Sequence, residues 1–150
     1  MHGEFAATHD DVDQVVAWTV IRAARELSRR LADELTELDL TPVEFGTLVQ
    51  LATEDELNQA DLARAVGVRA QSMSAVTSGL EGRGLVERGA APGRGRASRM
   101  HLTSAGRELL GRAWPRVEAS NAWFPDGGAD VVAALRPFTD GGAPAGPGVA

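Results

Sequence analysis

The sequence contains no cysteine and no lysine, and it lacks any apolar run of the length that a membrane helix needs. Without cysteine, the chain has no disulfide, no thiolate metal site and no cysteine redox switch. The acidic N-terminus lacks the charged-then-apolar layout of a signal peptide, and no apolar stretch approaches about 18 residues. We therefore expect a cytoplasmic protein of one domain, since 150 residues are enough to form a genuine core.

Basic charge is scarce over the whole chain and is concentrated in its middle. The net charge is −6, yet residues 58–112 carry nine arginines and only four acidic residues. Residues 1–57 carry four arginines and thirteen acidic residues. A basic segment between acidic ends is expected when that segment faces phosphate. All 15 basic residues are arginine, which suits bidentate contacts to phosphate and guanine, although a GC-rich coding bias would give the same composition.

The N-terminal part of the chain predicts a flexible arm followed by a long helix. Residues 1–9 show no periodicity, and Thr8 with Asp11 resembles a capping box. From Val12 to Leu38 the apolar residues recur at close to the helical period, which predicts one amphipathic helix of roughly seven turns. A helix of that length indicates that part of its apolar stripe packs against a second subunit.

A second capping box predicts the start of the next helix. Thr41 and Glu44 have the required spacing, and Pro42 occupies the first helical position, where its missing N–H costs nothing. We expect this helix to reach about Ala52.

The stretch Asn58–Thr103 predicts two short helices followed by two short strands. The helices run from Asn58 to Gly67, where the glycine provides a left-handed stop, and from Arg69 to Glu81. Val68 in the turn is expected to plug the core. Residues 85–89 and 98–103 alternate like strands and are joined by a loop rich in glycine and arginine. This order is typical of a helix-turn-helix with a β-wing, which suits a DNA groove and its flanking phosphates.

The C-terminal part predicts two further helices and a disordered tail. The first begins after Thr103 and contains Pro115, which predicts a kink or an interruption. Asp130 is placed to cap a last short helix. Residues 139–150 are rich in glycine, proline and alanine, and we expect them to be disordered.

Several segments together resemble the MarR family of bacterial transcription regulators, in the family's order and spacing: Leu40–Phe45, Gln59–Ala63, Gly67–Met73, Leu80–Arg88 and Leu102–Arg107. The resemblance covers about residues 12–124. It implies a mainly α fold with a small antiparallel β-wing, which is a winged helix-turn-helix with a helical dimerisation region. We expect the dimerisation region at 10–40 and 104–138, and the DNA-binding lobe at 41–103.

The resemblance also implies a function. Members of this family are obligate homodimers that read pseudo-palindromic operators in double-stranded DNA, and many have a small-molecule pocket between the dimer base and the DNA-binding lobe. We therefore expect a repressor that a small molecule releases from DNA. The alternative is a winged-helix module that binds a protein partner through the same face. An enzyme is not expected, and neither is a cofactor, because no catalytic pairing, phosphate loop or metal cluster occurs at a usable spacing.

The candidate DNA contacts are the short side chains on the polar face of the second short helix and the arginines of the wing. Slim polar residues beside alanine fit a major groove, and arginines at a hairpin tip fit a minor groove or phosphate. The set is Arg69, Ala70, Gln71, Ser72, Ser74, Ala75, Ser78, Arg94 and Arg96. Arg69 stands where the family usually has a capping serine. The alternatives are an ordinary polar helix face and a solvated loop.

Aromatic residues are candidates for lining a pocket for an aromatic or lipophilic effector. The set is Trp18, Phe45 and Trp114, with Arg22 to pair an effector carboxylate or phenolate, and Trp123 is a further aromatic candidate. The alternatives are core or dimer packing for the aromatics and, for Arg22, pairing with a nearby acid such as Glu26. A metal site is not expected, because the three histidines at positions 2, 9 and 101 are too scattered to converge on one ion.

Overall fold

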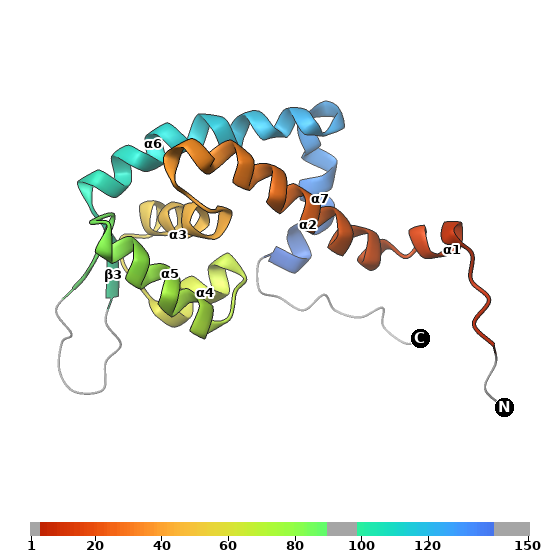
Figure 1. Ribbon diagram of the computed structural model, residues 1–150, viewed down its shortest axis with the longest axis horizontal. Coiled ribbons are helices and arrows are strands. Elements are labelled where there is room, and N and C mark those ends of the chain that lie inside the picture. Colours follow the sequence, from red (N-terminus) through yellow and green to blue (C-terminus); the bar gives the residue numbers. More distant parts are fainter. Residues whose placement is uncertain (1–3, 90–98, 140–150) are drawn as a thin grey trace.

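The computed structural model describes residues 4–89 and 99–139, which form a mainly helical fold with one small antiparallel sheet (Figure 1). The helices are α1 His9–Asp13, α2 Val16–Leu35, α3 Pro42–Thr53, α4 Gln59–Val66, α5 Ala70–Gly82, α6 Ser104–Ala119 and α7 Ala129–Thr139. Short 3-10 turns are η1 Thr36–Leu38, η2 Ser120–Trp123 and η3 Pro125–Gly128. The strands are β1 Leu57–Asn58, β2 Val86–Arg88 and β3 Arg99–Leu102. The predicted fold class is confirmed.

The helices form two groups (Figure 1). Helices α2 and α6 run side by side along one edge of the molecule, and α3, α4 and α5 pack beneath them. Helix α1 lies beyond the first turn of α2, away from the rest of the molecule, and α7 turns back after the end of α6. Over the described part of the chain, no helix is both long and apolar enough to span a bilayer.

The N-terminal residues form two helices, α1 and α2, so the prediction of one continuous helix from Val12 to Leu38 was wrong. The Thr8 capping box is present and α1 begins at His9, but Val15 is extended, with φ −76° and ψ 99°. The Thr19 hydroxyl donates to the carbonyl of Asp13 at 2.8 Å, an oxygen that a continuous helix would pair with the N–H four residues later. The adjacent β-branched Val15 and Val16 favour the extended conformation, and α2 therefore starts afresh at Val16.

One core joins the two groups of helices. Its members that have no more than 1% exposure include Leu35 of α2, Leu48 and Leu51 of α3, Leu62 of α4, Met73 and Leu80 of α5, Val86 of β2, Met100 of β3 and Ala113 of α6. The capping box of Thr41 and Glu44 is present, with both reciprocal hydrogen bonds, and it starts α3 at the predicted residue. Phe45 of α3 is buried in this core, whereas Val49 is only partly buried.

The sheet has a third strand that the periodicity did not reveal. Strand β3 is central and pairs antiparallel with β2, and also with β1, where Leu57 faces Met100. Because β1 is only two residues long, it has no alternation to detect. Its pairing fixes the start of α4 to the sheet.

Helix α6 begins against the turn that follows α5. The Thr103 hydroxyl accepts the Gly106 N–H at 3.0 Å and donates to the Gly84 carbonyl at 2.7 Å. The Thr103 N–H donates to the Leu85 carbonyl at 3.1 Å. A Cβ added at Gly106 would collide with that carbonyl oxygen, so only glycine permits this approach.

The structure decides three points about the C-terminal predictions. Helix α6 continues across Pro115 without an interruption, because the carbonyl deprived of its partner belongs to exposed Gly111 and can be hydrated. Asp130 lies in the first turn of α7 rather than at its cap, since the helix begins at Ala129. Thr139 is the last residue of α7, and the remainder of the predicted disordered tail lies outside the described residues.

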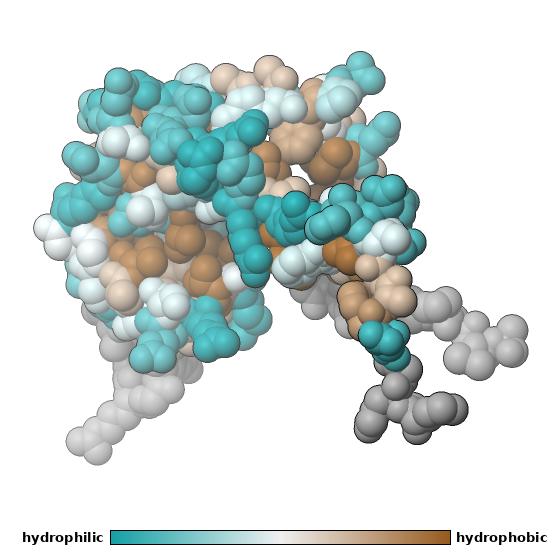
Figure 2. Space-filling model, turned by 45° about the vertical axis from the view of Figure 1, so that its right-hand side comes forward, coloured by the Kyte–Doolittle hydropathy of each residue, from teal (hydrophilic) through white to brown (hydrophobic). Residues whose placement is uncertain are grey.

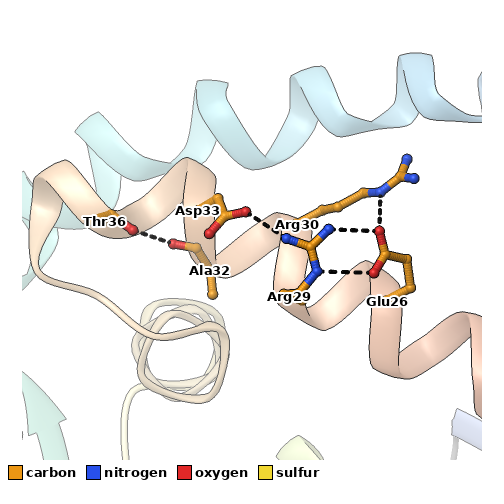
Figure 3. Close-up of polar contacts among 6 residues, drawn as sticks. All are labelled: Glu26, Arg29, Arg30, Ala32, Asp33 and Thr36. Atoms are coloured by element: carbon orange, nitrogen blue, oxygen red, sulfur yellow. Dashed lines mark hydrogen bonds and ion pairs between the residues drawn. The ribbon is translucent and has the colours of Figure 1, made fainter.

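A charged cluster stabilises the exposed face of α2 (Figure 3). Glu26 accepts two hydrogen bonds from Arg29, at 2.8 and 3.0 Å, and one from Arg30 at 2.8 Å. Arg29 also donates to Asp33 at 3.2 Å. The guanidinium groups of Arg29 and Arg30 lower the pKa of the Glu26 carboxyl to about 2. The cluster is local to one helix, where such pairs support helix formation.

Apolar side chains remain exposed near both ends of the described chain. Figure 2 shows hydrophobic residues in separate surface patches between hydrophilic residues. The exposed residues of the N-terminal part are Phe5, Val15, Val16, Trp18 and Ile21, and those of α7 are Val131, Val132 and Phe138. The apolar stripe predicted for the first helix is therefore buried only towards its C-terminal end.

Candidate nucleic-acid interface

Local signals place α4 and α5 as the sequence predicts. The Asn58 side chain accepts the Asp61 N–H at 2.8 Å and caps α4. Gly67 ends α4 in the left-handed region, with φ 79°, and Val68 donates its N–H to the Ala63 carbonyl at 3.0 Å. Val68 is partly buried against the core, which is the role expected of it. The turn therefore directs the chain from α4 into α5 with little freedom.

Helix α5 has a buried face and an exposed face. Met73, Thr77 and Leu80 have 0% exposure, and the Thr77 hydroxyl donates to the Met73 carbonyl at 3.0 Å, so its burial leaves no polar atom unpaired. The predicted contact residues of this helix all lie exposed on the opposite face: Arg69, Ala70, Gln71, Ser72, Ser74, Ala75 and Ser78. Within the described chain, none of their side chains makes a hydrogen bond or an ion pair. The structure thus presents this set as one free surface.

The first turn of α5 has no side-chain cap. Arg69 is the N-cap residue, with φ −71° and ψ 148°, and its side chain makes no capping hydrogen bond to the helix. The first N–H groups of the helix and the Arg69 guanidinium lie at the same end of α5. Backbone N–H groups at a helix start attract anions, and phosphate is the anion that DNA offers.

Several other arginines of the basic segment pair with acidic neighbours. Arg64 pairs with Asp61 on α4. Arg88 lies 3.4 Å from Glu81, and Arg99 lies 3.9 Å from Glu56. These pairs are half-exposed, and exposed ion pairs of this kind hold their partners only weakly. Arg94 and Arg96, the predicted wing contacts, lie outside the described residues.

The four residues predicted for an effector pocket separate into two places. Phe45 and Trp114 stack, with ring centroids 6.4 Å apart and an angle of 26° between the planes. Trp18 instead lies under the Arg25 guanidinium at 5.9 Å on α2. Arg22 pairs with Asp13 at 2.9 Å rather than with Glu26, because the break before α2 brings Asp13 within reach. Within one chain, the partners of Trp18 and Arg22 are therefore on α2 and α1, and Phe45 and Trp114 form a separate pair.

A cavity lies beside Trp114, between the end of α3 and α6. Its volume is about 380 Å³, and it is lined mainly by apolar atoms of Val49, Ala52, Leu110, Gly111, Trp114 and Pro115, with Thr53 and Arg107 as polar members. Arg107 was not among the predicted site residues. The available signal was an arginine in the first turn of a helix, where its charge opposes the helix dipole.

No group of three or more potential ligand residues gathers around a metal position in the described part of the chain. His101 of β3 has its Nδ1 3.8 Å from the carboxylate of Glu56, which precedes β1.

Known protein families and solved structures resemble this chain in sequence and in fold. A family model described as "MarR family" matches residues 38–97. Among the curated proteins, none matches the sequence. A transcriptional regulator of the MarR family from Silicibacter pomeroyi is 26% identical, with a TM-score of 0.69, and the match covers 85% of this chain and 89% of that one.

Two further solved structures are similar. A MarR family transcriptional regulator from Rhodococcus sp. RHA1 is 25% identical with a TM-score of 0.72, over 88% of this chain and 91% of the other. CouR from Rhodococcus jostii RHA1, bound to p-coumaroyl-CoA, is 24% identical with a TM-score of 0.72, over 85% and 90% of the two chains. At that identity the likeness to CouR concerns the fold. The family model, the winged helix-turn-helix fold and the exposed face of α5 agree: over residues 38–97 the chain matches the MarR family, and its fold is similar to that of transcriptional regulators of this family.

Proposed function

We propose that this protein is a homodimeric repressor that binds a pseudo-palindromic operator through α5 and leaves it when a small molecule binds. The observation that carries the proposal is the exposed face of α5, whose side chains have no partner within the described chain. Such a repressor acts on the DNA of its own cell, so the proposal places it in the cytoplasm.

The dimensions and chemistry of α5 suit a major groove. A helix of 13 residues is about 20 Å long, and a major groove about 12 Å wide admits one helix with short side chains. Gln71 can bond an adenine edge in a bidentate manner, whereas Ser72 and Ser74 can donate to or accept from several bases. Arg69 is placed for a phosphate or a guanine, and Arg94 and Arg96 are proposed to enter the adjacent minor groove.

The proposed homodimer is supported by the exposed apolar residues at the two ends of the described chain. Val16 has 74% exposure and Val132 has 58%, so both leave apolar surface in water that a second copy could cover. A two-fold dimer presents two copies of α5, which would read half-sites about one helical turn of DNA apart.

The proposed effector site is the cavity beside Trp114. A volume of about 380 Å³ is within the usual range for small-molecule sites, and Trp114 and Arg107 offer an aromatic surface and a positive charge. CouR has been solved with p-coumaroyl-CoA and, separately, with a 23-mer DNA duplex. Because the cavity lies between α3 and α6, a ligand that favours one arrangement of these helices would shift the population away from the DNA-binding form.

The test is a binding titration of the purified protein against labelled DNA from the region upstream of its own gene, at several salt concentrations. We expect specific binding that weakens steeply with salt, as the release of counterions from phosphate requires. Gln71→Ala should reduce the discrimination between operator and random DNA by about 1–3 kcal/mol. Salt-insensitive or absent binding would contradict the proposal.

A charge-reversed wing separates DNA binding from binding to a protein partner. Arg94→Glu combined with Arg96→Glu should abolish DNA binding, because each arginine would be replaced by a charge that phosphate repels. A DNA affinity that survives both substitutions would favour the protein-interaction module instead.

A further inference from the structure

The chain turns sharply between α2 and α3, and we call residues 35–41 of this turn the elbow. Asp39 adopts the left-handed conformation, with φ 51°, which is uncommon for a residue other than glycine. The Leu40 N–H donates to the Leu35 carbonyl at 3.4 Å, and the Asp39 N–H donates to the Thr36 carbonyl at 3.0 Å. Three leucines of the elbow are buried: Leu35, Leu38 and Leu40. The path of the elbow is therefore fixed by both hydrogen bonds and the core.

Arg83 joins the end of α5 to the elbow. It follows the last residue of the helix, and its Nη1 donates to the Asp39 carbonyl at 2.7 Å. The same nitrogen lies 3.7 Å from Oε2 of Glu44, the oxygen that accepts the Thr41 N–H in the capping box of α3. One side chain thus connects α5 to both the elbow and the first turn of α3.

Arg116 joins α6 to the same turn. Its Nη2 donates to the Glu37 carboxylate at 2.8 Å, and its Nη1 donates to the Glu34 carbonyl at 3.3 Å. Of the ion pairs among the described residues, only those of Arg83 and Arg116 join helical segments that are far apart in the sequence. The remaining pairs are local to neighbouring turns or involve a residue of the sheet.

These contacts matter more for geometry than for stability. Both arginine side chains are more than one-third exposed, and ion pairs at such positions contribute little to the free energy of unfolding. Their geometric effect is larger. A tilt of about 10° around the C-terminal end of α5 would move its first residue by roughly 3 Å, since the helix is about 20 Å long. That displacement is close to the rise of one base pair, about 3.4 Å.

We propose that Arg83 directly, and Arg116 through α6, whose N-cap Thr103 bonds the turn after α5, are positioning residues that fix the angle of α5 relative to α2. They thereby set the half-site spacing at which a dimer of this protein binds DNA. The inference rests on the proposed function, because half-site spacing applies only to a dimer on an operator. Helix α2 carries part of the apolar surface assigned to the dimer. The direction of α5 relative to α2 therefore decides how far apart the two copies of α5 lie.

The first experiment measures that distance without DNA. The chain has no cysteine, so Gln71→Cys, near the start of α5 and on its exposed face, accepts one spin label per protomer. Pulsed electron paramagnetic resonance should give one narrow distribution of label-to-label distances in the unmodified protein. Arg83→Met or Arg116→Met should shift or broaden this distribution by roughly 3 Å. Arg112→Met is the matched control, because exposed Arg112 has no ion pair within the described residues. An unchanged distance in both variants would overturn the proposal.

The second experiment measures the preferred spacing directly. A binding site is selected from random duplex DNA with the unmodified protein, and its two half-sites are then moved apart or together by one base pair. We expect the unmodified protein to prefer one spacing by about tenfold, and both variants to lose or shift that preference while still binding. Equal weakening at every spacing would indicate a phosphate contact and would contradict positioning.

Glu37→Gln tests whether Arg116 acts by holding the position of α5 or only through its positive charge. This substitution breaks the same pair as Arg116→Met but changes the net charge in the opposite direction. If the pair positions α5, both variants lose the spacing preference; if only charge matters, Glu37→Gln strengthens DNA binding and keeps the preference. If the unmodified protein binds no DNA at any spacing, the proposed function and the half-site part of this inference both fail. The label distances then still report whether the two arginines hold α5.

Discussion

The lobe from α3 to β3 and the terminal helices α1 and α7 differ in how much of their apolar surface they bury within one chain. Helices α3, α4 and α5 each bury at least two residues, and the core of the lobe includes Leu48, Leu62 and Met73 at 0% exposure. Helices α1 and α7 bury no residue. The lobe contributes most of the residues of the single core, whereas α1 and α7 have apolar residues that the chain itself does not cover.

Because of this difference, we expect folding of each protomer and association of two protomers to depend on different parts of the chain. A substitution in the lobe should act on the folding of each protomer, whereas a substitution at the terminal helices should act on association with a second copy. The two responses can be measured separately, by unfolding and by sedimentation, and the comparison fails if they coincide.

The largest expected effect is that of a cavity in the lobe. Leu48→Ala removes a fully buried side chain that packs in the core, and we expect a loss of about 2–5 kcal/mol in the free energy of unfolding. Urea denaturation followed by circular dichroism measures it. Val132→Ala is the matched terminal control and should change unfolding by less than about 0.5 kcal/mol at low protein concentration. Equal losses in the two variants would show that the lobe is not the more self-sufficient region.

A steric clash at the start of α6 should come next. Gly106→Ala places a methyl group against the Leu85 carbonyl, and overpacking of this kind costs about 1–3 kcal/mol. Gly111→Ala on the same helix has open space around the added atom and should stabilise the protein by up to about 1 kcal/mol. Thermal unfolding of both variants measures the contrast. A stable Gly106→Ala variant would show that α6 does not approach the turn after α5 so closely.

Charges on the exposed apolar surface should weaken association. Val16→Glu and Val132→Glu each place a carboxylate in the surface assigned to the dimer, and we expect at least about tenfold weaker dimerisation, or about 1.4 kcal/mol. Sedimentation equilibrium measures the dissociation constant. Ala65→Glu, on the exposed surface of α4, should leave it unchanged. If all three variants dimerise as the unmodified protein does, the exposed residues of α2 and α7 are not the interface.

The smallest effect concerns the charged cluster on α2. The folded-state pKa of Glu26 is about 2, below its ordinary value of 4.5, so its contribution to stability is present above pH 4.5 and is lost as the pH falls towards 2. The difference in unfolding free energy between the unmodified protein and Glu26→Gln should therefore shrink over that range. Carboxyl carbon shifts measured by NMR report the pKa itself. A Glu26 that titrates near 4.5 would show that Arg29 and Arg30 do not hold it.

Local signals in the sequence predicted the helix starts well. The capping boxes at Thr8 and Thr41, the Asn58 cap and the Gly67 stop all occur where the sequence places them. Each depends on residues within four positions of one another, so the physical cause is contained in a short segment. The inward and outward faces of α5 were predictable for the same reason, because the helical period alone assigns them.

Contacts across long distances in the sequence were not predictable. Strand β1 exists only because Leu57 pairs with Met100, and two residues give no periodicity of their own. Residue type indicates the candidates for an effector pocket, yet the fold pairs Phe45 with Trp114 and places Trp18 and Arg22 on α2. Residue type indicates what a side chain can bind and does not indicate which neighbour the fold brings to it.

The sequence by itself determined the mainly helical winged helix-turn-helix, the limits of most helices and the face of α5 that is free to bind. Only the tertiary structure decided that Arg83 and Arg116 meet the same turn between α2 and α3, and that a cavity lies beside Trp114. The reason is the range of the interactions. Hydrogen bonds within one turn of a helix are set by neighbouring residues, whereas contacts between residues 44 or 79 positions apart depend on how the whole core packs.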